Sequence, residues 1–394
     1  MFDLISLKNS LQNVEGFYFD GVNVGLRDDK EQGDVAFIRS DTPCEVSAVF
    51  TTNRFRAAPI KHFLKYPKDF KSDFLLINAK NANAMTGERG VEDIEEILSK
   101  IPIKVTNPLM SSTGVIGVPL DKEKIISAFD KFDFDARDAK KTARSIMTTD
   151  SFEKEIAFRV ELSDGSFFNI AAIAKGAGMI NPAMATMLCF IITDANIPKE
   201  DMDELLKEAV DESFNNISVD GDTSTNDSVM LFANHKKSVY DKNAFSFALK
   251  EITKELSMMI LKDGEGSNKV VAFEIKGAKS KEDAKRASKA LSNSPLVKTA
   301  LFGEDPNWGR IASTIGASGI ECDEEKLKIF YDELLIYSKD YPTLDPKREL
   351  EATKIMKKDS FKIVCDLSIG SASHVSYGCD LSYEYVKINA DYRT

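Results

Sequence analysis

The chain has 394 residues, with 52 lysines and arginines against 63 aspartates and glutamates, so its formal net charge is −11. Hydrophobic residues make up 43% and charged residues 29%, as is typical of a globular protein with an ordinary core. The surplus of acid argues against nucleic-acid binding and against docking on an anionic membrane, because both need a basic face.

The apolar stretches, the N-terminus and the cysteines all favour a cytoplasmic protein. The longest apolar stretch, residues 187–192, is far shorter than the ~20 residues of a membrane helix. The N-terminus has an acid at position 3 and no basic start, unlike a secretory signal. Five cysteines without a C-x-x-C pair favour reduced thiols over disulfides or structural zinc. We expect a cytoplasmic enzyme or small-molecule binder, with two or three domains at roughly 150 residues each.

The first half of the chain contains a short apolar segment at 103–105, which predicts a strand ahead of the Ser-Thr-Gly sequence at 112–114. An apolar run begins just after Thr186 and also predicts a strand. Apolar residues at helical spacing between 202 and 214, in a segment opened by Pro198 and acids, predict a helix.

The second half carries two further helical patterns. Residues 245–260 predict a long helix, and Gly264 stands where a left-handed C-terminal cap is expected. Ser280, with Asp283 three residues on, predicts the N-cap of the next helix. Alternation at 327–331 and 361–367 predicts half-buried strands. With no regular β-α-β spacing, these patterns favour a mixed α/β fold with a largely antiparallel sheet.

Residues 175–194 form the most informative segment, because a glycine loop leads abruptly into an apolar strand at Thr186. A phosphate-binding loop is one reading, but the third glycine of a dinucleotide motif and the Walker Lys-Ser/Thr pair are absent. A second reading is a turn that feeds a core strand, with Thr186 selected for its β-propensity. In a third reading Thr186 is a nucleophile.

A nucleophilic threonine needs a base, and the three histidines (His62, His235 and His374) lie in no recognised triad motif. A threonine at a chain N-terminus can use its own α-amino group instead. That amine has a reference pKa of about 7.7–8.0, so part of it is unprotonated near neutral pH. This reading requires the chain to cut itself between Ala185 and Thr186.

Residues 175–194 resemble the self-cleavage region of the ornithine acetyltransferases, bifunctional enzymes of arginine biosynthesis. Further blocks resemble that family in the same order along almost the whole chain: residues 48–54, 78–87, 112–117, 146–150, 220–227, 263–266, 304–310 and 389–394. The chain departs from the family at Lys80 and Met85, where the family carries small residues.

The resemblance implies a precursor that cuts itself into an α chain, residues 1–185, and a β chain, residues 186–394, with a C-terminal subdomain at about 280–394. It implies the self-cleaving, N-terminal-nucleophile-like fold shared with the DmpA aminopeptidases, with mixed, mostly antiparallel sheets flanked by helices. The implied reaction moves acetyl from N2-acetylornithine to L-glutamate through an acetyl-enzyme. An α2β2 heterotetramer is usual in the family, and acetyl-CoA is an alternative acetyl donor in some members.

The resemblance also implies roles for single residues. Thr186 is the nucleophile, and the Thr113 hydroxyl and the Gly114 N–H form the oxyanion hole. The substrate-binding positions are Thr149 (or its neighbour Thr148), Lys175, Thr186, Glu265, Asn389 and Thr394. Lys175 suits the substrate α-carboxylate and Glu265 suits the ornithine ammonium.

Several alternatives stay open. Lys175 could be a solvated loop lysine, and Glu265 an exposed acid at a helix end. The acidic loop 220–227 lacks EF-hand spacing, so we expect it to brace the site without a metal. We expect no cofactor, because the acyl donor is itself a substrate. Other functions for the chain are a self-processing aminopeptidase or amidase, and a non-cleaving binding homologue.

Overall fold

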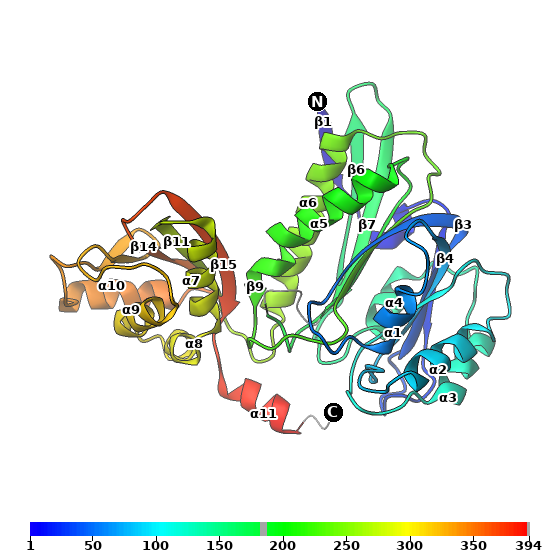
Figure 1. Ribbon diagram of the computed structural model, residues 1–394, viewed down its shortest axis with the longest axis horizontal. Helices are drawn as coiled ribbons and strands as arrows, with labels where there is room; N and C mark the ends of the chain where they lie inside the picture. The colour runs from blue at the N-terminus through cyan, green and yellow to red at the C-terminus, as the bar shows by residue number, and fades with distance from the viewer. Residues whose placement is uncertain (182–186, 392–394) are drawn as a thin grey trace.

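The computed structural model describes residues 1–181 and 187–391 (Figure 1). Within these ranges the chain forms two β-sheets with helices packed on them, which confirms the mixed α/β class predicted from the sequence. The predicted nucleophile Thr186, its neighbour Ala185 and the terminal Thr394 lie outside the described residues, so the predictions made for these three residues stay predictions.

The first sheet, as described, contains nine strands: β1 (Phe2–Ser6), β2 (Phe17–Val22), β3 (Val35–Phe50), β4 (Lys71–Asn78), β5 (Leu109–Ser112), β6 (Lys154–Leu162), β7 (Phe167–Lys175), β8 (Leu188–Thr193) and β10 (Ser228–Ala233). Its order is β1-β6-β7-β8-β10-β3-β4-β5, and β2 pairs with the first half of β3. Only β8–β10 and β4–β5 are parallel among these described pairs.

Helices cover both faces of this sheet. One face packs against α5 (Lys199–Glu212) and α6 (Lys242–Lys262), which lie side by side in Figure 1. The other helices of this half are α1 (Ala58–Phe63), α2 (Arg89–Leu98), α3 (Lys122–Ser127) and α4 (Ala139–Ser145). α4 packs on the opposite face of the central strands β7 and β8, which are therefore buried on both sides. α2 and α3 belong to a separate apolar core, which covers the face of β4 that α4 does not cover. Short 3-10 helices span Ser10–Asn13, Ala128–Asp130 and Phe214–Asn216.

The second sheet has the order β13-β12-β14-β11-β15-β9 in the described chain. Its strands are β9 (Ile217–Ser218), β11 (Val270–Ala278), β12 (Lys328–Tyr331), β13 (Leu334–Tyr337), β14 (Ser360–Asp366) and β15 (Ala372–Cys379). The helices are α7 (Lys281–Asn293), α8 (Pro295–Phe302), α9 (Trp308–Ala317), α10 (Pro346–Met356) and, at the C-terminal end, α11 (Tyr383–Asp391). A separate apolar core joins this sheet to α7, α9 and α10. Antiparallel pairs predominate in the two sheets together, as the sequence predicted.

Local sequence signals correctly located α5, α6 and α7, and two expectations were wrong. Ser280 caps α7 by accepting a hydrogen bond from the backbone N–H of Asp283, 3.1 Å away, as predicted. Gly264 does not adopt a left-handed conformation. α6 ends at Lys262, the residue after it, Asp263, has an ordinary negative φ, and Gly266 takes the positive φ of 69°. The strand predicted at 103–105 is absent, and the strand in this region, β5, begins at Leu109.

The first sheet brings the ends of four strands together. Lys175, the last residue of β7, pairs with Leu188 at the start of β8. Leu188 pairs in turn with Ser228 of β10, which pairs with Phe50 at the end of β3. These strand ends define the part of the fold where the predicted site residues gather. Among the helices that the structure describes, none has the length and apolar composition that crossing a membrane requires.

Candidate active site

The predicted oxyanion-hole pair, Thr113 and Gly114, directly follows β5. Thr113 is buried, and Gly114 has φ +133°, a conformation that residues with a side chain rarely adopt. A Cβ on Gly114 would lie 2.2 Å from the carbonyl carbon of Lys80, so the loop at Lys80 packs directly on the glycine. Only glycine fits here, because any Cβ would overlap the backbone of Lys80 and Asn81.

Asn226 fixes this loop from the other half of the chain. Its side-chain amide donates hydrogen bonds to the carbonyl oxygens of Ser112, at 2.8 Å, and Ala82, at 2.6 Å. Asn226 itself is buried, so both bonds are shielded from water. The backbone around Thr113 is therefore held in one position before any substrate arrives, which is what an oxyanion site needs.

Lys80 and Met85, the two departures from the family pattern, both lie in left-handed backbone. Their φ angles are 69° and 59°, and Asn83 between them has φ 47°. Glycine adopts this conformation at little cost, whereas a Cβ atom raises its energy by about 1–2 kcal/mol. Lys80 and Met85 both carry this cost.

Lys175 is the centre of the described site. Its side chain is 3% exposed, so the structure excludes the solvated loop lysine. Its Nζ donates to the Thr148 Oγ1 at 2.7 Å and to the Thr113 Oγ1 at 3.3 Å. Of the two threonines left open by the sequence, Thr148 is the one that contacts this lysine. The lysine thereby joins a predicted substrate-binding position to a predicted oxyanion position.

A second lysine lies behind the first in a buried ionic network. Lys154 is fully buried, and its Nζ donates to Asp150 Oδ1, 2.8 Å away, and to Asp263. Asp150 also accepts the backbone N–H of Gly176, at 2.6 Å, and lies 3.8 Å from the Nζ of Lys175. The network joins three chain segments that are separated in the sequence: residues 150–154, residues 175–176 and Asp263. It thereby fixes the start of the glycine loop.

Burial and charge decide how these groups titrate. Burial lowers the pKa of Lys175, with the positive charge of Lys154 acting in the same direction, while Asp150 opposes the shift. Burial opposes ionisation of Asp150, but the two lysines outweigh it and hold its pKa below the ordinary value. Asp150 is therefore a carboxylate at neutral pH, and Lys175 loses its proton more readily than a surface lysine does.

Glu265 and Asn389 form a second pair of predicted binding residues. The Asn389 amide donates to the Glu265 carboxylate at 2.8 Å, so the C-terminal helix α11 reaches the predicted site. Glu265 packs on the glycine loop, where a Cβ at Gly178 would lie 2.4 Å from its carboxyl group. The charge of Glu265 also acts on Lys175. The structure thus brings Thr113, Lys175, Glu265 and Asn389 into one region. Thr149 is partly exposed.

Asp227 is a residue that the sequence did not single out. Its Oδ1 accepts the backbone N–H of Met187, the residue that follows Thr186, at 3.0 Å. Its Oδ2 is buried and has no hydrogen-bond partner among the described residues. Burial raises the pKa of this carboxyl well above its usual range. The only sequence signal was its position as the last residue of the acidic loop 220–227.

The remainder of that loop braces the glycine loop, as predicted. Asp220 accepts the backbone N–H groups of Met179, at 2.6 Å, and Ile180, at 3.0 Å. The Asn181 amide donates to the Gly221 carbonyl at 2.7 Å. Across residues 1–181 and 187–391, no group of three or more histidine, cysteine or acidic side chains is placed to hold a metal ion.

The fixed loop of Thr113 and Gly114, the buried cation of Lys175 and the carboxylate of Glu265 lie at one end of a mixed α/β sheet, an arrangement suited to acyl transfer on a zwitterionic substrate. Sequence comparison then identifies the family. A family model described as the ArgJ family matches residues 18–394, and the chain belongs to this family.

Relatives match over their whole length. The "Arginine biosynthesis bifunctional protein ArgJ" of Wolinella succinogenes is 55% identical, covering 100% of both chains. The "Glutamate N-acetyltransferase" of Methanocaldococcus jannaschii is 43% identical, covering 91% of this chain and 94% of the relative. A crystal structure of the ArgJ protein of Bacillus halodurans is 37% identical with a TM-score of 0.48, covering 52% of this chain and 98% of that chain.

Proposed function

We propose that this protein transfers the acetyl group of N2-acetylornithine to L-glutamate, in arginine biosynthesis, through an acetyl ester on Thr186. The observation that carries the proposal is the contact between Lys175 and Thr113, which joins a buried cation to an oxyanion donor. The relatives are named for arginine biosynthesis and for glutamate N-acetyltransfer, and they match nearly the whole chain.

Self-processing comes first in this proposal. The Thr186 hydroxyl attacks the Ala185 carbonyl carbon, the peptide C–N bond breaks, and an ester forms while the nitrogen becomes the free α-amine of Thr186. Water then hydrolyses the ester and separates an α chain, 1–185, from a β chain, 186–394. The free amine serves as the base for the hydroxyl.

The transfer reaction repeats this chemistry on the substrate. Thr186 attacks the acetyl carbonyl carbon, and the Thr113 hydroxyl and the Gly114 N–H stabilise the oxyanion. The amine that accepted the Thr186 proton returns it to the departing ornithine nitrogen. The glutamate amine then attacks the ester and leaves as N-acetylglutamate. No cofactor or metal enters, because the acetyl donor is a substrate.

The binding residues divide by charge. Protonated Lys175 binds the substrate α-carboxylate, with Thr148 or Thr149 beside it. Glu265 binds the ornithine ammonium, supported by Asn389 and by Thr394. The charge of Glu265 already acts on Lys175, so both ends of a zwitterion can be held at once.

Acetyl-CoA is a second acetyl donor in this proposal, since relatives are named as bifunctional. The enzyme would then also make N-acetylglutamate from acetyl-CoA and glutamate. We further propose a cytoplasmic α2β2 heterotetramer built from the two self-cleaved chains.

Intact-mass analysis with N-terminal sequencing of the purified protein tests the proposal. We expect two fragments, one beginning at Thr186, and an unbroken chain from the Thr186→Ala variant. A fully active unbroken wild-type chain would refute the mechanism. Release of free acetate from acetylornithine without glutamate would instead indicate an amidase.

A further inference from the structure

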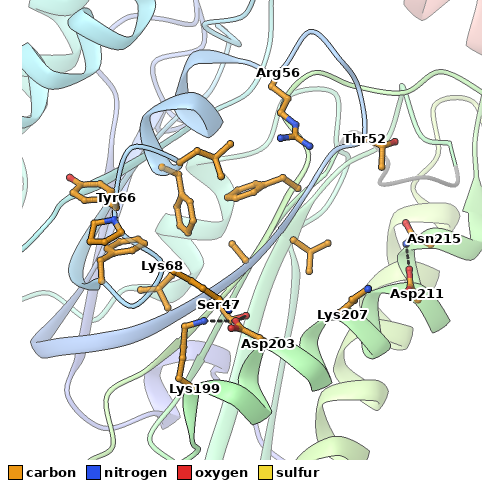
Figure 2. A pocket seen from close by; sticks show the side chains of 18 residues that line it. Ser47, Thr52, Arg56, Tyr66, Lys68, Lys199, Asp203, Lys207, Asp211 and Asn215 are labelled. Atoms are coloured by element: carbon orange, nitrogen blue, oxygen red, sulfur yellow. Dashed lines mark hydrogen bonds and ion pairs between the residues drawn. The ribbon is translucent and has the colours of Figure 1, made fainter.

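A groove of about 750 Å3 lies along the second half of β3 (Figure 2). None of the residues that line it belongs to the candidate active site. One wall is the strand itself, residues 46–50. The others are the aromatic segment 63–70, which begins at the last residue of α1, and the polar side of α5.

The strand that forms this wall has one unpaired edge. Residues 45–50 pair with β10 on one side, but on the other side β4 pairs only as far as Glu45, because it begins at Lys71. The Thr51 N–H donates to the Asp227 carbonyl, at 3.0 Å. Hydrogen-bonded pairs alternate along an antiparallel ladder, so the peptide groups of Val46, Ala48 and Phe50 face the groove.

The two sides of the groove differ in chemistry. Phe50 packs edge-on against Phe63, with ring centroids 4.8 Å apart, and Tyr66 stacks on Phe70 in the same cluster. On the other side, the Ser47 hydroxyl donates to Asp203 of α5 at 2.6 Å. One side is therefore aromatic and the other is polar.

The polar side of the groove is locally basic, although the chain carries a net charge of −11. Arg56, Lys68, Lys199 and Lys207 line the groove against only two acids, Asp203 and Asp211. Asp203 already pairs with Lys199 and Ser47 (Figure 2). Lys68 and Lys207 are exposed and have no ion-pair partner among the described residues. The groove thus has uncompensated positive charge.

We propose that this groove binds an extended acidic peptide segment of another protein, which adds as a strand to the free edge of β3. Backbone hydrogen bonds to Val46, Ala48 and Phe50 would supply affinity. Successive side chains of a strand point to opposite faces. A peptide with alternating apolar and acidic residues therefore sets apolar groups against Phe63 and Tyr66 and carboxylates beside Lys199 and Lys207.

Fluorescence anisotropy with a labelled hexapeptide of alternating glutamate and valine tests this proposal on the full-length protein. We expect saturable binding, at least about tenfold weaker for the same peptide with lysine in place of glutamate, because the groove is basic. A peptide with the same glutamates and valines arranged in two separate blocks should bind as weakly as the lysine peptide. Equal binding of the three peptides would overturn the proposal.

Two variants locate the binding. Ala48→Pro removes an N–H that faces the groove without breaking a bond to β10, and proline is tolerated at strand edges. Lys207→Glu reverses a charge on an exposed position of α5. Both should weaken peptide binding at least about tenfold and leave acetyl transfer and circular dichroism unchanged. Unchanged affinity in Lys207→Glu would mean that the lysines only protect the edge from aggregation. Light scattering compares the oligomeric state of each variant with that of the wild type. A smaller assembly in either variant would show that the edge of β3 binds a second copy of this chain, and would overturn the proposal.

Discussion

Lys175 and Thr113 are 62 positions apart in the chain, yet the lysine Nζ lies 3.3 Å from the threonine Oγ1 in the interior of the protein. A hydroxyl that accepts a hydrogen bond from a cation has its own O–H free to donate elsewhere. An oxyanion forming beside Thr113 would therefore receive a hydrogen bond from a group polarised by the positive charge of Lys175.

Replacing Thr113 by valine removes this donor while keeping nearly the same shape. We expect kcat for acetyl transfer to fall about 10²–10³-fold, as when one oxyanion-hole donor is lost. Thr113→Ser retains the hydroxyl and serves as the matched control. A valine variant within about threefold of the wild-type kcat would show that Thr113 makes no transition-state contact.

The buried network behind Lys175 predicts a large effect on stability. Lys154→Met leaves Asp150 with only the more distant Lys175 and leaves Asp263 without a cation. Breaking a buried ion pair on one side costs about 3–5 kcal/mol, because the remaining charge is uncompensated. Urea denaturation of both proteins measures the loss.

The double variant Lys154→Met, Asp263→Asn is the matched control for this experiment. It removes the carboxylate that Lys154→Met leaves without a cation, so it should be more stable than Lys154→Met alone. If the second substitution adds its own full destabilisation instead, Lys154 and Asp263 are not energetically coupled.

Asp227 predicts a specific dependence of stability on pH. Because burial raises the pKa of this carboxyl in the folded state, the native protein keeps a proton that the unfolded chain has released. Its contribution to stability is complete below the unfolded pKa of about 3.9 and is lost as pH rises through the folded pKa. Asp227→Asn cannot ionise and should lack this decline.

The measurement compares urea midpoints across that pH range for Asp227→Asn and its parent, both in the Thr186→Ala background so that neither chain is cut. We expect the two curves to converge at low pH and the parent to become relatively less stable as pH rises. Parallel curves would mean that Asp227 is ionised in the folded protein, with its charge balanced by a group near Met187.

The C-terminal helix supports a prediction that activity can be lost while stability is kept. None of the described residues of α11 is buried, so the part of this helix that a deletion of residues 389–394 removes contributes little packing. The deletion does remove the Asn389 partner of Glu265. We expect acetyl transfer to be crippled while the thermal melting temperature stays near that of the full chain. Full activity in the truncated protein would contradict the binding role, and Asn389→Ala separates the Asn389 contribution from that of Thr394.

The sequence by itself determined the local elements and the family. Helix periods and the Ser280 cap depend on neighbours a few residues away, so α5, α6 and α7 could be located directly. The ordered blocks that resemble the ornithine acetyltransferases identified Thr113, Gly114, Lys175, Glu265 and Asn389 as candidates. The prediction of a left-handed cap at Gly264 was wrong. The left-handed residue is Gly266, which packs closely against Ser382 and Tyr385 at the start of α11, and such tertiary contacts cannot be read from the local sequence.

Only the tertiary structure decided which charges share a buried region. Lys154, Asp150 and Asp263 lie in ordinary sequence contexts, and nothing local shows that the sheet and the end of α6 enclose them together. Likewise, Asp227 meets Met187 because β8 and β10 pair in parallel, and the edge of β3 is free because β4 starts late. Long-range pairing and burial create these features, since charge interactions become strong only where water is excluded.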